Sequence, residues 1–357
     1  MDGARGKLVL LCASVLVALV LSEGALRILD PYPEVSHERG SGTSELPPRD
    51  ATYAIPDDRL GWKLRPDMNL RLSLADSYDV TITSNSKGIR DRREFSYTKP
   101  PGTLRILALG DSFTFGTGVE NDETWPARLE FHLREAGTVA EVINAGVGAY
   151  GTDQTYLYYL AEGAKYGADL VVIGYCPCHM RRNATGFFIA PKPRFVRTEQ
   201  TLTLVPPAAT VSLPAANPLA ARSYLYRYVN HAFDTLAIVP SYFSIGEAYR
   251  ITALLYENLA RDIQADDSRV IVAYVPRKQE ITSRWSFMLR KHERAFSALI
   301  TGLGVDIVDL APEFRRGNGP SLFLRNEMGH VSKVGNDLIG LTLARHIIAH
   351  RSLASSR

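Results

Sequence analysis

Cysteine is scarce in this chain, and neither sign of charge dominates it. Of the 357 residues only three are cysteines, Cys12, Cys176 and Cys178, which excludes a fold built on a disulfide framework. The 41 basic and 38 acidic residues leave a net charge of +3, and no long basic run interleaved with aromatic residues occurs. The composition therefore argues against nucleic acid as a partner. The length suffices for a full α/β core with one insertion.

The most apolar stretch lies at the N-terminus. Residues 8–21 are almost wholly apolar and follow Arg5 and Lys7, which is the pattern of an export signal. The stretch is short for a spanning helix, which needs about 20 apolar residues, and no clear Ala-x-Ala cleavage site follows it. We expect residues 1–29 to be a retained signal anchor, with a cleaved signal peptide as the alternative. The basic residues predict a cytoplasmic N-terminus and a periplasmic or extracellular main domain, secreted if the signal is cleaved.

Four further segments follow along the chain. Residues 30–57 are polar and rich in Pro, Ser, Glu and Gly, and they are interpreted as a linker. Residues 58–100 carry short alternating stretches, which predict a small β-rich lead-in. Residues 101–352 form the main domain, with an insertion at about 184–243. The insertion contains a hairpin pattern at 194–204, and we interpret it either as a substrate cap or as a surface excursion.

The main domain alternates strand and helix patterns, which predicts parallel strands joined by right-handed crossovers. The expected strands are residues 106–109, 141–144, 170–175, 270–275 and 305–309. The expected helices are residues 124–136, 154–166, 245–262, 286–303 and 334–350. The predicted fold is α/β, a three-layer α/β/α sandwich with a five-stranded parallel flavodoxin-like sheet, plus the small β appendage and the insertion.

A serine stands at the end of the first expected strand. Ser112 follows residues 106–109 through a Gly-Asp pair, and ligands of open parallel sheets bind at this end of the strands. A serine nucleophile needs a base and a group that orients the base. Near the C-terminus, Glu327-x-x-His330 offers both, because histidine exchanges protons near neutral pH. Asp111 is interpreted as a cap of the turn that follows the strand.

These motifs resemble those of the GDSL/SGNH hydrolase family. Gly-Asp-Ser112 resembles the block that carries the nucleophile, and Glu327-x-x-His330 resembles the last block, usually Asp-x-x-His. The resemblance covers about residues 105–350. The preceding Gly-Trp62 and residues 85–91 look like the lead-in of exported, membrane-anchored bacterial members. The resemblance implies the fold predicted above and an acyl-ester hydrolase with a Ser-His-Glu triad that requires no metal and no organic cofactor.

The second block of the family aligns with residues 142–152. This alignment places Ala149 where the family has the glycine whose backbone N–H binds the oxyanion. Alanine keeps the N–H, so the resemblance implies that the N–H groups of Ser112 and Ala149 stabilise the oxyanion if the backbone angle is permitted. Gly148, which directly precedes Ala149, is a second candidate for this role.

The third block departs from the family, which has Asn-Asp after the third strand with the asparagine as a further oxyanion donor. Here Cys178 stands in the place of the asparagine and His179 follows it. A thiol is a poor donor, so we expect that His179 or Asn183 substitutes, that the site is slow, or that it binds without turnover. Cys176-Pro-Cys178-His179 is interpreted as two small buried residues at a strand end rather than as a metal site.

Three functions remain open from the sequence. The first is a cell-envelope serine ester hydrolase that acts on acyl esters, including acetyl esters, of a glycan or a lipid. The second is an O-acyltransferase that passes an acyl group from Ser112 to a hydroxyl of a surface glycan. The third is a catalytically impaired protein that binds a glycan or another partner. In each case the expected partners are the acyl ester or glycan and the membrane, through the N-terminal helix.

Overall fold

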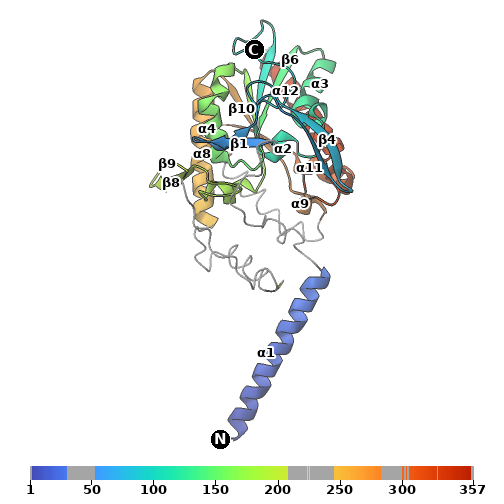
Figure 1. Ribbon diagram of the computed structural model, residues 1–357, viewed down its shortest axis with the longest axis vertical. Coiled ribbons are helices and arrows are strands. Elements are labelled where there is room, and N and C mark those ends of the chain that lie inside the picture. The colour runs from blue at the N-terminus through green and yellow to red at the C-terminus, as the bar shows by residue number, and fades with distance from the viewer. Residues whose placement is uncertain are drawn as a thin grey trace. The chain divides into compact units, whose positions relative to one another are not determined.

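The computed structural model describes residues 2–29, 53–207, 223, 225, 245–282, 300, 303, 305–327 and 329–354. The chain divides into two compact units, one of residues 1–44 and 212–247 and one of residues 45–211 and 248–357. The second unit contains the sheet and the candidate site (Figure 1). The described residues of the candidate site therefore all belong to the second unit.

Five parallel strands form the centre of the second unit. They are β5 (Leu104–Gly110), β6 (Ala140–Gly146), β7 (Leu170–Tyr175), β10 (Arg269–Tyr274) and β11 (Asp306–Asp309). Their order in the sheet is β11-β10-β7-β5-β6, and every neighbouring pair is parallel. The chain therefore starts in the interior of the sheet, moves to the β6 edge and returns across β5, which is the flavodoxin-like order. This confirms the predicted fold class.

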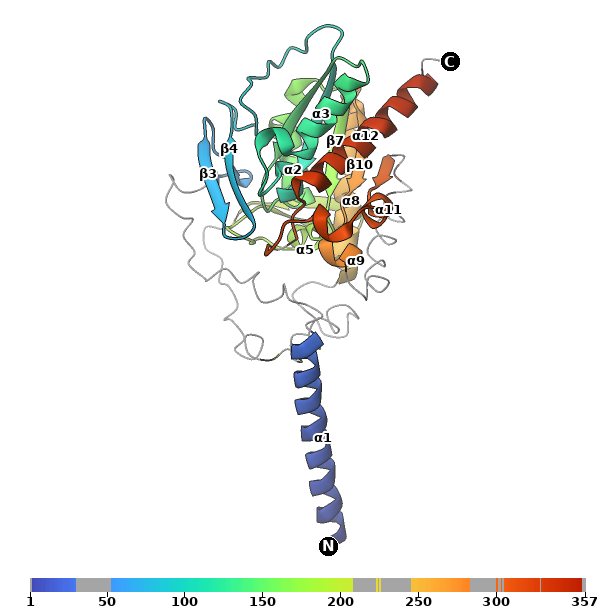
Figure 2. The same ribbon diagram turned by 90° about the vertical axis from the view of Figure 1, so that its right-hand side faces the viewer.

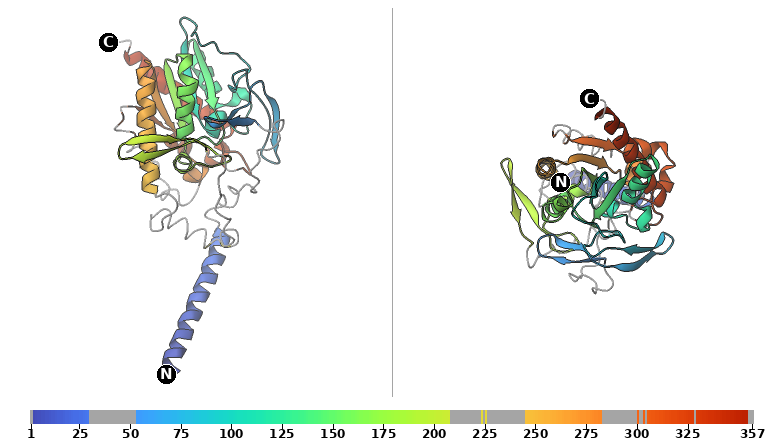
Figure 3. Two further views of the ribbon diagram at one scale, coloured as in Figure 1. Left: turned by 60° about the vertical axis from the view of Figure 1, so that its left-hand side comes forward. Right: turned by 90° about the horizontal axis from the view of Figure 1, so that it is seen from above.

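Helices cover both faces of the sheet (Figure 3). One face carries α4 (Thr152–Ala161) and α8 (Ile245–Ala265), and the other carries α3 (Trp125–Glu135) and α12 (Lys333–Ala354). Strand β5 contributes side chains to the cores on both faces of the sheet, because successive side chains of a strand point to opposite faces. Leu107 and Leu109 belong to the core beneath α8, whereas Ile106 and Ala108 belong to the core beneath α3 and α12. The three-layer sandwich follows from this alternation.

Shorter elements fill the connections. They are α2 (Ser112–Phe115), η3 (Asn121–Glu123), η4 (Gly163–Tyr166), α5 (His179–Asn183), α9 (Lys278–Thr282), α11 (Ala311–Arg316) and η5 (Gly319–Leu322). The hairpin expected at 194–204 is confirmed as β8 (Arg194–Thr198) and β9 (Thr201–Val205), which pair antiparallel. Most of the helix expected at 286–303, and most of the insertion beyond residue 207, lie outside the described residues.

The lead-in forms two antiparallel hairpins that pack on the sheet domain. They consist of β1 (Ala54–Asp57) with β2 (Gly61–Leu64), and β3 (Asn69–Leu74) with β4 (Tyr78–Thr83), the second of which is seen in Figure 2. The end of the expected linker, residues 54–57, is corrected, because it forms β1 and pairs with β2. The buried side chains of Trp62 and Ile82 belong to the same core as Leu107 of β5. At the edge of β4, the amide N–H of Thr83 donates to Asn121 of η3 at 3.2 Å. The lead-in therefore shares the core of the main domain.

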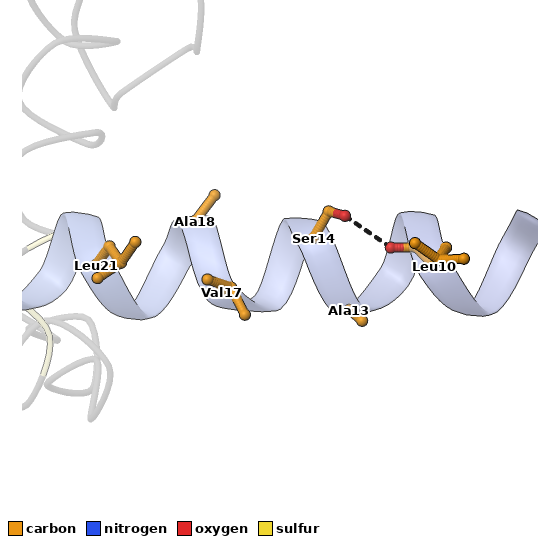
Figure 4. Close-up of a pocket in the computed structure, with 6 residues that line it drawn as sticks. All are labelled: Leu10, Ala13, Ser14, Val17, Ala18 and Leu21. Carbon is orange, nitrogen blue, oxygen red and sulfur yellow. Dashed lines mark hydrogen bonds between the residues drawn. The ribbon is translucent and has the colours of Figure 1, made fainter.

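In the first unit, α1 (Asp2–Leu29) is one long apolar helix. The segment of residues 9–27 is long and apolar enough to cross a bilayer, and none of its described side chains is buried. Figure 4 shows one face of this helix, formed by Leu10, Ala13, Ser14, Val17, Ala18 and Leu21. The hydroxyl of Ser14 donates to the carbonyl oxygen of Leu10 at 2.8 Å, so the polar side chain of this face is satisfied within the helix.

Candidate active site

Ser112, His330 and Glu327 form one chain of hydrogen bonds. The hydroxyl of Ser112 lies 2.8 Å from Nε2 of His330, and Nδ1 of the same ring lies 2.5 Å from Oε1 of Glu327. The serine and the histidine are 218 positions apart in the sequence. The structure therefore brings together the three residues that the sequence motifs single out, in the order Ser112, His330 and Glu327.

The end of β5 determines the place of Ser112. Gly110 ends the strand with φ +150°, and a Cβ on it would lie 2.8 Å from the carbonyl oxygen of Gly174 on the neighbouring strand. Asp111 then caps α2, because its side chain accepts a hydrogen bond from the N–H of Phe113 at 3.0 Å. Ser112 is thus the first residue of α2, and its side chain is 8% exposed at the carboxyl end of the sheet.

The other end of α2 is held by the lead-in. The guanidinium of Arg90 is fully buried and donates to the carbonyl oxygens of Phe115, Gly116 and Val119. It also lies over the ring of Phe115, 4.4 Å from its centroid. The last carbonyl groups of a helix have no partner within the helix. Arg90 supplies that partner, and it thereby fixes the short helix that carries Ser112.

Glu327 orients His330 through several contacts. Its Oε2 accepts from the backbone N–H of Gly329 at 2.9 Å and from that of His330 at 2.8 Å, in addition to the contact of Oε1 with the ring. Burial alone would raise the pKa of Glu327, but the hydrogen bonds from His330 and from the two backbone N–H groups bring this pKa below its usual value. Glu327 is therefore a carboxylate at neutral pH, as an orienting acid must be.

Asp111 lies next to Arg182 and His179. Arg182 of α5 donates to its Oδ2 at 2.7 Å, and Nε2 of His179 lies 3.2 Å from the same oxygen. Burial opposes ionisation of Asp111, but His179, Arg182 and the N–H of Phe113 hold its pKa well below its usual range. Asp111 therefore acts as a charged cap at the base of α2.

His179 and Asn183, the two candidates for a substitute donor at the third block, both have buried side chains. The ring of His179 is fully buried, with Nδ1 3.4 Å from the hydroxyl of Thr152. The amide of Asn183 donates to Thr252 of α8 at 2.9 Å and accepts from the backbone N–H of Asp153 at 3.3 Å. Both side chains thus join α5 to the helix layer above the sheet.

Cys178 and Cys176 are joined by a disulfide. The interpretation of two small buried residues is corrected in this respect, because it did not include a bond between residues so close in sequence. Sγ of Cys178 lies 3.5 Å from Oδ2 of Asp111, and a sulfur in a disulfide has no hydrogen to donate. In this state the position of the family asparagine therefore carries no side-chain donor.

The segment of the second block lies against the end of β5. The N–H of Val147 donates to the carbonyl oxygen of Gly110 at 3.1 Å, and the N–H of Tyr150 donates to that of Val147 at 3.3 Å, which closes a turn. Ala149 sits in this turn with φ +68°, a conformation that favours glycine. Within the described part of the chain, the N–H groups of Ala149 and Ser112 make no hydrogen bond. A Cβ on Gly148 would lie 2.6 Å from the hydroxyl of Tyr53, so this position has no space for a larger residue unless Tyr53 shifts.

Two groups of described side chains bring possible metal-ligating atoms within 4.8 Å of one another. The first consists of Asp111, Cys178 and His179, but the sulfur of Cys178 is bonded to Cys176 and is not a thiolate. The second consists of Asp306, His346 and His350 on β11 and α12. There Nε2 of His346 lies 2.6 Å from Asp306. Neither group includes a residue of the Ser112–His330–Glu327 chain.

Of the comparisons with known proteins, only the one with solved structures gives matches. No protein-family model matches the chain, and no curated protein matches it. Among solved structures, it is similar to a lipase/acylhydrolase from Enterococcus faecalis, with 16% identity, a TM-score of 0.41, and coverage of 69% of this chain and 96% of that one. It is also similar to a GDSL-like lipase from Bacteroides thetaiotaomicron, with 13% identity, a TM-score of 0.39, and coverage of 69% and 89%.

A third similar structure is an acetyl xylan esterase, with 13% identity, a TM-score of 0.41, and coverage of 68% of this chain and all of that one. The parallel five-stranded sheet and its strand order agree with the fold class that the sequence predicted.

Proposed function

We propose that this protein is a serine ester hydrolase of the GDSL/SGNH type. The observation that carries the proposal is the chain of hydrogen bonds from Ser112 through His330 to Glu327, at the end of the sheet where ligands bind. A serine hydroxyl is a weak nucleophile unless a base removes its proton. His330 is within reach of that proton, and the carboxylate of Glu327 stabilises the positive charge that the ring then carries.

In the proposed reaction, the hydroxyl oxygen of Ser112 attacks the acyl carbonyl carbon while Nε2 of His330 takes the hydroxyl proton. The N–H groups of Ser112 and Ala149 bind the developing oxyanion. The alcohol leaves with the proton from His330, and an acyl-enzyme remains on Ser112. Water then attacks this ester, again with His330 as base, and releases the acid.

The oxyanion site of this proposal relies on backbone groups. Donors aimed at the oxyanion are worth about 10²–10³ in kcat each in a well-studied protease. The N–H of Ser112 belongs to the first turn of α2, where backbone N–H groups have no partner within the helix. The N–H of Ala149 is unpaired among the described residues. Without the third donor of the family, we expect slow turnover of unactivated esters.

The proposal places the enzyme at a membrane through α1, with the sheet domain outside the cytoplasm. Support comes from the length and apolar composition of residues 9–27 and from the basic residues before them. Acyl esters of envelope glycans or lipids are the substrate class that this location favours.

The test is labelling of the detergent-solubilised full chain by a fluorophosphonate, which reacts with activated serines. We expect wild-type protein to be labelled, and Ser112→Ala and His330→Ala to lose the label. His346→Ala is the matched control, since His346 also pairs with a carboxylate, Asp306 at 2.6 Å, but lies on α12 away from Ser112. A folded wild type that is never labelled would falsify the proposal and favour a binding protein.

The acceptor of the acyl group needs a separate test, because the same acyl-enzyme serves hydrolysis and transfer. Cells that carry the wild-type protein are compared with Ser112→Ala cells for the acyl content of their surface glycans. Loss of acyl groups in the wild-type cells supports hydrolysis. A gain of acyl groups would instead identify an O-acyltransferase.

A further inference from the structure

Trp62 of the lead-in contacts the turn that carries Ala149. Its indole N–H donates to the carbonyl oxygen of Gly148 at 3.0 Å, and the hydroxyl of Tyr150 donates back to the carbonyl oxygen of Trp62 at 2.6 Å. Trp62 is fully buried, and its ring meets that of Tyr150 edge-on, with centroids 5.8 Å apart. The hairpin β1–β2 and the turn are thus joined by a reciprocal pair of buried hydrogen bonds.

The carbonyl of Gly148 and the N–H of Ala149 belong to the same peptide group. A peptide group is planar and trans, so its C=O and its N–H point in opposite directions. The hydrogen bond from Trp62 to this carbonyl therefore fixes the direction of the Ala149 N–H. It also polarises the peptide, because hydrogen bonds in a chain strengthen one another.

The geometry of the turn explains why the Ala149 N–H needs this hydrogen bond to keep its direction. In the hydrogen-bonded turn from Val147 to Tyr150, Ala149 has a positive φ whereas Gly148 does not, which is the pattern of a type II turn. A flip of the central peptide converts a type II turn into type I and reverses the direction of the Ala149 N–H. Alanine disfavours the type II form, because its side chain is strained at positive φ. The indole of Trp62 opposes that flip.

We propose that Trp62 is a positioning residue for the oxyanion site. Its indole N–H holds the peptide between Gly148 and Ala149 in the orientation that presents the Ala149 N–H to the substrate. This inference rests on the proposed ester hydrolysis at Ser112. It gives the lead-in hairpin a part in the reaction, although Trp62 touches no reacting atom.

The test compares Trp62→Phe with Trp125→Phe in the full chain, with p-nitrophenyl acetate as the ester. Trp125 is the matched control, because it is also fully buried, at the start of α3, and its indole N–H has no hydrogen-bond partner among the described residues. Both variants lose the same atoms. We expect kcat of Trp62→Phe to fall about 10- to 100-fold below that of Trp125→Phe with KM nearly unchanged, since an oxyanion contact acts in the transition state.

A rescue experiment separates positioning from stability. Ala149→Gly removes the strain of the type II turn, so Trp62→Phe combined with Ala149→Gly is expected to recover part of the lost kcat, whereas a packing defect at Trp62 would not be repaired. If Trp62→Phe fails to fold, benzothienylalanine introduced at position 62 removes the N–H and keeps the shape of the ring. The same fall in kcat is then expected.

The wild type first has to hydrolyse the ester and take the fluorophosphonate label, which shows that Ser112 is active. If the position-62 variant and Trp125→Phe then have equal kcat values, the inference is overturned and the proposed function is left intact. A wild type that neither hydrolyses the ester nor takes the fluorophosphonate label would overturn both. A fall in kcat at position 62 that Ala149→Gly partly reverses supports the inference.

Discussion

At the scale of the residue, the glutamate at position 327 is held by the backbone next to His330. The longer side chain reaches back to accept hydrogen bonds from the backbone N–H groups of Gly329 and His330 with one oxygen, and it contacts the His330 ring with the other. Both carboxylate oxygens are therefore engaged, and the extra methylene group does not displace the acid from the ring.

This arrangement predicts a specific dependence of stability on pH. Because the pKa of Glu327 is lowered in the folded state, its ionised form stabilises the fold above the unfolded pKa of about 4.3. This contribution is lost as the pH falls through the lowered pKa of the folded state. Glu327→Gln is therefore expected to be less stable than wild type at neutral pH, and the difference should shrink in acid.

The measurement is the free energy of unfolding in urea, for wild type and Glu327→Gln, at a series of pH values from about 7 to about 3, below the ordinary glutamate pKa. Glu135→Gln, at the exposed end of α3, is the control for loss of one carboxylate. A wild-type-to-variant difference that stays constant through the acid range would contradict the role given to the carboxylate.

The sequence was informative about the triad and less so about its surroundings. Ser112, Glu327 and His330 stand in short motifs, so their types and spacing could be recognised. The orientation of His179 and Asn183 could not, because it depends on Thr152 and Thr252, which come from other elements. The disulfide between residues two positions apart has no signal in the sequence beyond the presence of both cysteines.

At the scale of the element, α2 has only four residues and depends on contacts from outside itself. Arg90 supplies three of these contacts through its hydrogen bonds to carbonyl groups at and beyond the end of α2. Arg90→Met is therefore expected to remove the charged donor that three carbonyl groups share, which leaves Phe115 and Gly116 only the long hydrogen bonds from Asn144 at 3.5 Å and from the N–H of Val119 at 3.4 Å. The free energy of unfolding should fall by about 2–4 kcal/mol. Ester hydrolysis should fall as well, because α2 carries Ser112.

Urea unfolding and p-nitrophenyl acetate turnover measure the two effects of Arg90→Met. Arg71→Met is the control, because the side chain of Arg71 is 74% exposed on β3 and pairs with Asp79 at the surface. Its stability and activity should stay close to those of wild type. An Arg90→Met variant as stable and active as Arg71→Met would show that α2 holds its shape alone.

The larger elements were predictable where apolar periodicity is strong. All five strands of the sheet occur where alternation of strand and helix patterns placed them. Four of them, β5, β6, β7 and β10, are largely buried and form apolar runs, whereas the edge strand β11 is mostly half-buried and has only the apolar pair Ile307 and Val308. The packing of the lead-in on the turn that carries Ala149 was not predictable. It depends on single hydrogen bonds such as that from Trp62 to Gly148, across 86 positions, which leave no periodic pattern.

At the scale of the whole molecule, the chain combines a unit that contains an apolar helix with a unit that contains a complete sheet domain. The candidate triad and the turn around Ala149 belong wholly to the second unit. The chemistry proposed for Ser112 therefore needs nothing from α1. The role of α1 is a matter of location, and it can be tested separately from catalysis.

If α1 is a retained anchor, the full chain should stay with membranes after washing in high salt and alkaline carbonate, which remove surface-bound proteins. A charge in the middle of the helix, as in Leu16→Arg, should reduce insertion, since an arginine at the centre of a spanning helix costs about 2.5–3.5 kcal/mol. Leu16→Met keeps the position apolar and should behave like wild type.

The N-terminal residue of the purified protein then decides between anchor and signal peptide. A mature chain that begins after the apolar run and appears in the soluble fraction would show a cleaved signal, whereas a membrane-bound chain that still contains residues 9–27 would show an anchor.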